Sequence, residues 1–140
     1  MKTKHILTLL ACTLLPLTAK AQQQPLTPEQ EEKKMREMIE KTVLRYEEDL
    51  KLEVWQTFYV DSILTHNYGE MSAETKELAE NRVENYDLYQ RITDKWENAT
   101  FEAFRRILNE EQWKKYLKNG AGRMQKDRDR RAAKREAKNK

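Results

Sequence analysis

The sequence predicts an all-α protein, and three observations support this fold class. Between Pro28 and Gly120, Gly69 is the only strong helix breaker. The same stretch is rich in Glu, Lys, Leu, Ala and Arg, which favour helices. Its apolar residues recur at spacings of three and four, the period of an amphipathic helix. We therefore expect one all-α domain, either a small helical bundle or an elongated helical hairpin.

The N-terminus has the features of an export signal. Lys2 and Lys4 precede an apolar run over residues 6–17, and a small-x-small cleavage signal follows it. We expect residues 1–21 to be a cleaved signal peptide, because the apolar run is short for a membrane anchor. Lipoprotein processing at Cys12 is the alternative, since a lipobox-like Leu-Leu-Ala precedes this cysteine.

The remaining chain is free of cysteine and divided in charge. Without lipidation, residues 22–140 contain no cysteine, so this part of the chain cannot perform thiol chemistry. It has no disulfides and must be stabilised by a hydrophobic core or by dimerisation. Residues 22–122 carry 15 Lys and Arg against 21 Asp and Glu, and residues 123–140 carry 9 against 3. The exported chain is therefore near neutral, so we expect no nucleic-acid partner despite the basic pI of the precursor.

The first helix is predicted to begin after a polar lead-in, residues 22–27, which we expect to be flexible. Thr27 is a preferred N-cap residue, and Pro28 suits the first helical position because its missing N–H costs nothing there. One apolar stripe follows, made by Met35, Met38, Ile39, Thr42, Val43 and Tyr46. Asp49 offers the cap of a second helix, although the first helix could also continue.

The next segment, residues 52–68, is apolar on most of its circumference. Such a helix lies in the centre of a bundle or is buried in a dimer. Gly69 is expected to end it, and Ser72 or Thr75 to begin the following helix.

Residues 89–107 form a long amphipathic pattern, after which Asn109 begins a short helix. Asn119 and Gly120 are predicted to end that helix, and the helical domain is placed at residues 28–122. The basic tail, residues 123–140, lacks an apolar stripe and is expected to be a solvated helix or disordered.

Two five-residue phrases mark predicted helix starts. Residues 26–30 and 108–112 each place a leucine before a cap residue and a glutamine three residues after it. The cap side chain accepts from an early N–H, and the glutamine reaches back to the cap's own N–H. Residues 52–56 repeat the leucine and glutamine without a capping residue, so this echo is given little weight. The helix-capping motif positions are Leu26, Thr27, Gln30, Leu108, Asn109 and Gln112.

An exported, cysteine-poor helical chain with two Leu-Thr-x-x-Gln phrases resembles the LTxxQ-motif proteins of the bacterial periplasm, the Spy/CpxP group. Asn109 replaces threonine in the second phrase, but asparagine caps as well as threonine. The resemblance implies a periplasmic helical cradle, an antiparallel homodimer, and an ATP-independent chaperone or envelope-stress protein acting on unfolded or envelope proteins. Two ordinary capping boxes are the alternative interpretation.

The rival hypothesis is a non-catalytic adaptor or sensor module that binds one envelope partner, with the basic tail as the candidate contact. This tail could simply be solvated, could lie on an acidic protein surface or on its own domain, or could bind anionic lipid. Its key residues are Arg123, Lys126, Arg128, Arg130, Arg131, Lys134 and Arg135.

The aromatic residues have two interpretations. Their helical spacing favours core positions. A chaperone would instead expose some of them on an apolar, charge-rimmed face that contacts clients. The candidates for client contact are Trp55, Phe58, Tyr59, Trp96 and Trp113.

No catalytic constellation is found in the sequence. His66 is the only histidine of residues 22–140, and it is the only candidate base for Ser62 and Ser72. A metal site would need His66 with carboxylates such as Glu70, or with ligands of a symmetry mate. We expect no enzyme activity, no cofactor and no bound metal.

Overall fold

The computed structural model describes residues 26–138, and its fold is all-α as predicted. The elements are α1 (Pro28–Leu50), α2 (Val54–Glu80), α3 (Tyr86–Ile107), α4 (Glu110–Tyr116), a π-helical turn η1 (Leu117–Ala121) and α5 (Gly122–Lys138). The long helices pack as a small bundle, and no strand occurs in this part of the chain. The predicted signal peptide, Cys12 and most of the predicted flexible lead-in lie outside the described residues.

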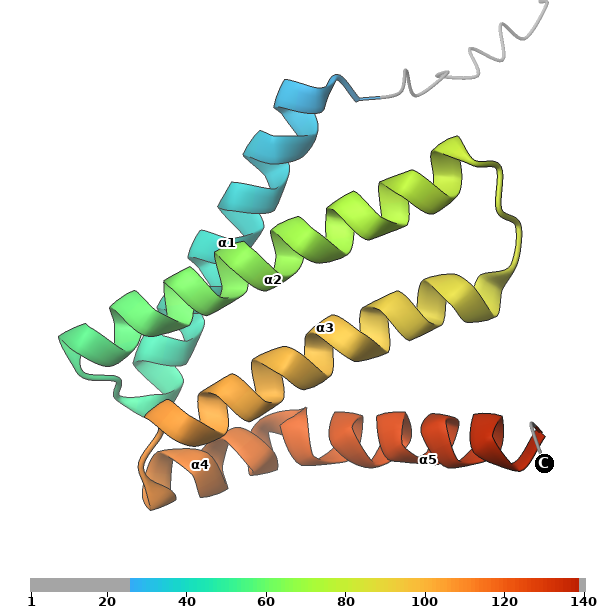
Figure 1. Cartoon of the computed structure of the whole chain (residues 1–140). Coiled ribbons are helices and arrows are strands. Elements are labelled where there is room, and N and C mark those ends of the chain that lie inside the picture. Colours follow the sequence, from blue (N-terminus) through green and yellow to red (C-terminus); the bar gives the residue numbers. More distant parts are fainter. Residues whose placement is uncertain (1–25, 139–140) are drawn as a thin grey trace, which may run out of the picture.

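The bundle is built around the α2–α3 hairpin. Figure 1 shows α2 and α3 running antiparallel, α1 crossing α2, and α5 returning alongside α3 after the short α4. Helix α2 packs against both α1 and α3, so it is a central helix of the bundle, one of the two positions that its apolar circumference predicted. Further contacts join α1 to α4 and α5 to α3. None of the helices between residues 26 and 138 combines the length and apolarity needed to cross a membrane.

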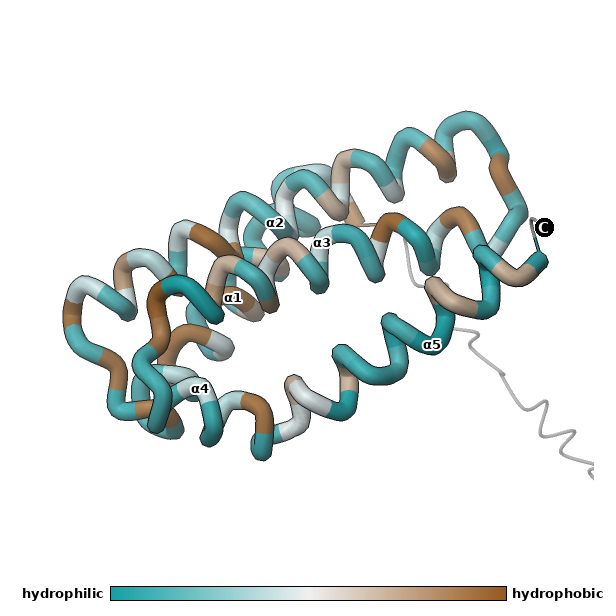
Figure 2. Tube along the Cα trace, turned by 60° about the horizontal axis from the view of Figure 1, so that its bottom comes forward, coloured by the Kyte–Doolittle hydropathy of each residue, from teal (hydrophilic) through white to brown (hydrophobic). Residues whose placement is uncertain are grey.

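The hydrophobic core is small and lies where α1 ends, α2 begins and α4 packs. Figure 2 shows hydrophobic positions gathered around this end of the bundle and a largely hydrophilic α5. Val60 and Phe104 are fully buried, and Tyr46 packs edge-on against Phe104 with ring centroids 5.4 Å apart. The buried core residues are Ile39, Val43, Leu50, Val60, Leu64, Phe104, Leu108 and Tyr116.

Two of the predicted helix starts are found at the expected residues. Thr27 caps α1 and Asn109 caps α4, each in a box that its glutamine completes. The first helix ends at Leu50, where Lys51 adopts a left-handed backbone conformation (φ 55°), so Asp49 begins no helix. The starts at Thr27 and Asn109 are predictable because each capping side chain acts within its own first turn.

The prediction that Gly69 ends a helix is wrong. Helix α2 continues through Gly69 to Glu80, so neither Ser72 nor Thr75 begins a helix. The next helix begins at Tyr86, with Asn85 accepting a hydrogen bond from the Asp87 backbone N–H at 3.0 Å. A mid-helix glycine costs about 1 kcal/mol relative to alanine. Packing of α2 against α3 offsets this cost, as in the hydrogen bond from the Asn67 amide to the Thr100 hydroxyl at 2.9 Å.

The predicted C-cap pair, Asn119 and Gly120, does interrupt the helix that Asn109 begins. Gly120 has a positive φ (118°), as a helix-terminating glycine often has. Gly120 lies inside η1, and a new helix, α5, follows directly from Gly122. The sequence signal was therefore local: it marked a kink between α4 and α5.

Candidate functional site

Two of the leucine–glutamine phrases meet at the base of the bundle. They are residues 52–56 and 108–112, and their glutamines form a reciprocal pair. The Gln56 side-chain amide donates to Gln112 Oε1 at 2.7 Å, and the Gln112 amide donates to Gln56 Oε1 at 2.8 Å. Both residues are buried. We call this contact the glutamine pair.

The glutamine pair satisfies the backbone of two loops at once. Gln56 accepts from the Glu53 N–H and donates to the Ile107 carbonyl at 2.9 Å, while Gln112 accepts from the Asn109 N–H and donates to the Lys51 carbonyl at 3.3 Å. Each amide thus uses both donors and accepts two hydrogen bonds. The pair locks the start of α2 to the start of α4.

The first phrase does not take part in this contact. Thr27 and Gln30 form an exposed capping box at the start of α1, and Leu26 is also exposed. The sequence interpretation underweighted residues 52–56 because Glu53 is a poor cap. The sequence signal that could have identified them is the equal spacing from leucine to glutamine in residues 52–56 and 108–112.

Four large apolar side chains lie exposed on the outward face at the start of α2. Their exposed fractions are 89% for Val54, 48% for Trp55, 67% for Phe58 and 50% for Tyr59. The three aromatic rings among them form one contiguous group, with the Tyr59 ring centred 6.1 Å from that of Trp55 and 5.8 Å from that of Phe58. We call these four residues the α2 patch. The Glu53 carboxylate orients one member by accepting from the Trp55 indole N–H at 2.6 Å.

The other two candidate aromatics are half-buried. Trp113 packs against Phe101 with ring centroids 4.9 Å apart. Trp96 donates to the Glu74 carboxylate at 3.2 Å and packs edge-on against His66 at 5.9 Å. The structure therefore brings together only the three candidate aromatics of α2.

His66 lies exposed on α2, one turn before the exposed Glu70. Within residues 26–138 no group of three or more His, Cys, Asp or Glu side chains is arranged to hold a metal ion.

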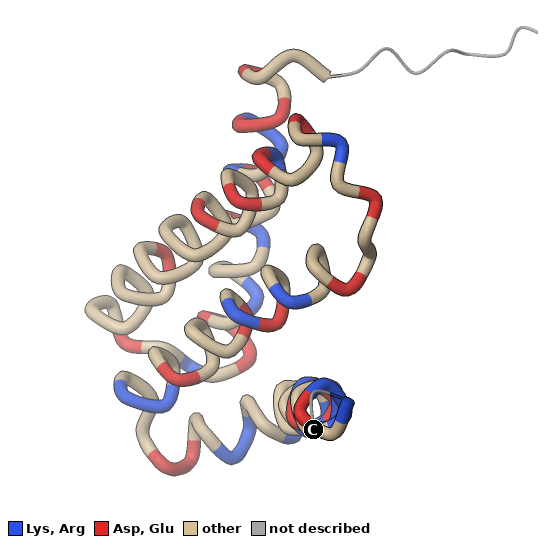
Figure 3. Tube along the Cα trace, turned by 45° about the vertical axis from the view of Figure 1, so that its right-hand side comes forward, with Lys and Arg blue, Asp and Glu red and all other residues tan. Residues whose placement is uncertain are grey.

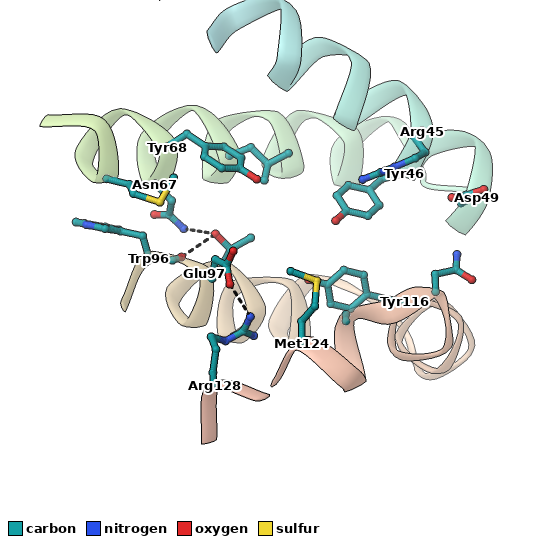
Figure 4. A pocket seen from close by; sticks show the side chains of 15 residues that line it. Arg45, Tyr46, Asp49, Asn67, Tyr68, Trp96, Glu97, Tyr116, Met124 and Arg128 are labelled. Atoms are coloured by element: carbon teal, nitrogen blue, oxygen red, sulfur yellow. Dashed lines mark hydrogen bonds and ion pairs between the residues drawn. The ribbon is translucent and has the colours of Figure 1, made fainter. Parts of the chain in front are cut away.

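A cavity of about 280 Å³ lies between α1, α2, α3 and the η1–α5 segment. Figure 4 shows its lining from close by, with Tyr46 on α1, Tyr68 on α2 and Tyr116 on the opposite wall. Burial raises the pKa of all three tyrosines, so each keeps its phenolic proton. The sequence interpretation did not find this interhelical cavity, because its walls come from segments as far apart in the sequence as Arg45 and Arg128.

Helix α5 is held to α3 by a row of arginines on its inner face. Arg128 pairs with Glu97 at 3.0 Å, and Arg135 pairs with both Asp87 at 3.0 Å and Asp94 at 2.9 Å. Arg131 also pairs with Asp94. We call Arg128, Arg131 and Arg135 the arginine ladder. Figure 3 shows the Lys and Arg positions around α5, seen nearly end-on.

The ladder perturbs its acidic partners. Burial alone would raise the pKa of Asp94, but hydrogen bonds from Arg131 and Arg135 outweigh it and hold the pKa below its ordinary value. Hydrogen bonds from Arg135 and Arg91 likewise lower the pKa of Asp87. The remaining tail candidates, Arg123, Lys126, Arg130 and Lys134, are exposed, and we call them the outer flank.

Comparison of this chain with known protein families, with curated proteins and with solved structures finds no match. The likeness to the LTxxQ-motif group therefore stands on the two quoted phrases and the predicted export signal alone.

Proposed function

We propose that this protein is a Spy/CpxP-like holding chaperone of the periplasm, which binds unfolded envelope proteins without nucleotide. The observation that supports this function best is the α2 patch. Folded monomers rarely expose contiguous groups of large apolar side chains without using them in an interaction. Unfolded chains expose the apolar segments that such a surface can bind.

The surroundings of the α2 patch suit reversible binding. Lys51, Glu53 and Asp61 are charged, exposed residues close to the patch in sequence. A charged rim keeps a protein soluble while its apolar centre binds a client. The glutamine pair anchors the first turn of α2, so the patch is presented on a fixed helix.

The proposal is tested by aggregation of a chemically denatured client at near-stoichiometric ratios of this protein. We expect suppression by the wild type and loss of most of it in the triple variant Trp55→Ser, Phe58→Ser, Tyr59→Ser. The matched control is Tyr86→Ser with Leu88→Ser, which removes exposed apolar side chains from α3. Equal suppression by all three proteins, or none by the wild type, would contradict a holding role for the patch.

We further propose that the working form is a homodimer. Residues 26–34, which include the first turns of α1, are exposed throughout, and Met38 is 43% exposed. A second copy packed along this part of α1 would cover side chains that the bundle leaves open. Sedimentation equilibrium should then give twice the monomer mass, and Met38→Glu should lower it toward one chain. A monomer at all concentrations would contradict the proposed dimer, but it would not affect the aggregation test of the holding role.

The second candidate function is an adaptor that binds one envelope partner through the outer flank. It is favoured by the arrangement of α5, whose inner arginines are engaged with α3 while the outer ones remain exposed. An acidic protein surface or anionic lipid would fit these cations. Deleting residues 123–140 is not a clean test, because it also removes Arg128 and Met124 from the cavity wall.

Charge reversal of the outer flank separates the two functions. The variant Arg123→Glu, Lys126→Glu, Arg130→Glu, Lys134→Glu keeps the arginine ladder. A chaperone acting through the α2 patch should suppress aggregation as before. An adaptor should lose its captured partner, or its binding to vesicles containing phosphatidylglycerol.

A further inference from the structure

The interhelical cavity has the chemistry of a second binding site, separate from the α2 patch. None of the four patch residues lines it. Its apolar surface comes mainly from Leu64, Met71, Trp96 and Met124. Its polar groups come from three tyrosines, from two pairs of opposite charges, and from Asn67, Thr100 and Asn119. An apolar body with a few placed polar groups is the usual composition of a ligand site.

The size of the cavity limits the occupant. Ligand pockets for drug-sized molecules begin at roughly 300 Å³, whereas an engineered apolar cavity of about 150 Å³ holds one benzene ring. At about 280 Å³, the interhelical cavity accommodates one aromatic ring together with a few further atoms. It is too small for a folded segment or a large cofactor.

The tyrosine hydroxyls can donate hydrogen bonds to the oxygen atoms of a ligand. A tyrosine keeps its proton at physiological pH, and burial raises the pKa of Tyr46, Tyr68 and Tyr116 further, so all three hydroxyls are available as donors. In Figure 4 the hydroxyl ends of Tyr46 and Tyr68 point from their helices toward the space between them. Peptide carbonyl oxygens are suitable acceptors for such donors.

The charges of the lining disfavour a strongly charged ligand. Glu97 and Arg128 neutralise each other at 3.0 Å. Arg45 and Asp49 lie one turn apart on α1 and line the cavity, and neither makes an ion pair within residues 26–138. These two opposite charges, like the Glu97–Arg128 pair, leave the lining without net charge.

We propose that the interhelical cavity binds a single aromatic side chain of an extended peptide, with the adjoining peptide carbonyls accepting hydrogen bonds from the tyrosines. The ring packs among Leu64, Met71 and Trp96. The site goes beyond the holding role of the α2 patch, since it recognises one side-chain class rather than apolar surface in general.

The test is titration of the purified protein with N-acetyl-phenylalaninamide, followed by amide chemical shifts in NMR. N-acetyl-alaninamide is the matched probe, because it has the same carbonyls and no ring. We expect saturable shifts around Tyr68, Thr100 and Ala121 with the first probe and none with the second. The same titration of the Tyr86→Ser variant should be unchanged.

Two variants locate the site. Ala121→Leu extends a half-buried side chain into the cavity and should weaken binding at least ten-fold. Tyr68→Phe keeps the ring and removes one donor, which should weaken binding about five-fold. If Ala121→Leu does not fold, the Tyr68→Phe result decides.

The proposal is overturned if the aromatic probe does not saturate, if its shifts centre on Trp55 and Phe58, or if Tyr68→Phe binds as the wild type does. None of these results depends on aggregation assays. A protein that holds clients but does not bind the probe would refute the cavity site and keep the proposed chaperone function.

Discussion

At the scale of single residues, burial decides how much each copy of the repeated capping motif contributes to the stability of the fold. Gln30 and Gln112 occupy the same position after a cap residue, and each accepts a hydrogen bond from its cap's N–H at 3.0 Å. Gln30 does this in solvent, whereas Gln112 is buried and also bonds to Gln56 and Lys51. The stability lost when a hydrogen-bonding group is removed is larger where its buried partners are left unsatisfied.

We therefore expect Gln112→Ala to lower the free energy of unfolding by about 2–3 kcal/mol, because buried groups of Gln56 and of the α1–α2 loop lose their partners. The control, Gln30→Ala, removes the same capping contact in solvent and should cost about 0.5 kcal/mol. Urea denaturation of both variants measures the difference. Equal costs would mean that the glutamine pair contributes no more than a surface cap.

The two glycines that the sequence marked as helix ends differ in backbone conformation. Gly69 lies mid-helix, with nothing within 4 Å of the position where a Cβ would stand. Gly120 also has free space but a φ of 118°, which side-chain-bearing residues rarely adopt. The same substitution should therefore have opposite effects at the two sites.

Gly69→Ala should raise the free energy of unfolding by about 0.5–1 kcal/mol, because it restricts the unfolded chain and favours helix. Gly120→Ala should lower it by about 1–3 kcal/mol, through strain in η1. Thermal unfolding followed by circular dichroism gives both values. A destabilised Gly69→Ala would indicate that α2 bends at this residue.

At the scale of elements, the sequence predicted the caps Thr27 and Asn109 and the break at Gly120, but not the end of α2 or the start of α3. Thr27 and Asn109 act on the N–H groups of their own first turn, so local sequence suffices to place them. Whether α2 continues past Gly69 depends on α3, which follows later in the chain. The position of α5 depends likewise on acids of α3, which pair with arginines 31 to 48 residues away in sequence.

Helix α5 differs from the other elements because ion pairs rather than apolar burial hold it. Asp94 is the centre of the arginine ladder, since it pairs with both Arg131 and Arg135. Its folded-state pKa is lowered, so its contribution is fully present above the unfolded pKa of about 3.9 and is lost as the pH falls through the folded value. We expect α5 to loosen below pH 4 before the core of the bundle unfolds.

Asp94→Asn should produce the same loosening at neutral pH. Hydrogen exchange is the measurement: amides of α5 should lose protection while those of α2 keep theirs. Glu136→Gln on the exposed side of α5 is the matched control and should change nothing. Unaltered protection of α5 in Asp94→Asn would show that its apolar contacts suffice.

At the scale of the whole molecule, the all-α bundle followed from helix propensity and apolar period, whereas the candidate sites did not. The sequence showed that residues 52–68 are apolar on most sides. Only the packing of α2 against α1 and α3 separates buried Val60 and Leu64 from exposed Phe58 and Tyr59. The interhelical cavity was equally inaccessible to sequence reasoning, because it exists only where α1, α2, α3 and α5 meet.

This separation of surface from core makes Trp55 a reporter of client binding. Trp55 is 48% exposed, whereas Trp96 and Trp113 are more deeply buried, against His66 and Phe101 respectively. In the free protein, acrylamide should quench a component of the emission that disappears in the variant Trp55→Phe. When a non-fluorescent denatured client is held on the α2 patch, that component should shift to shorter wavelength and lose much of its quenching, because the indole is then shielded from water. The emission of Trp55→Phe should stay unchanged on client addition. A client that alters both proteins equally would bind elsewhere on the bundle, and the α2 patch would then have no part in holding it.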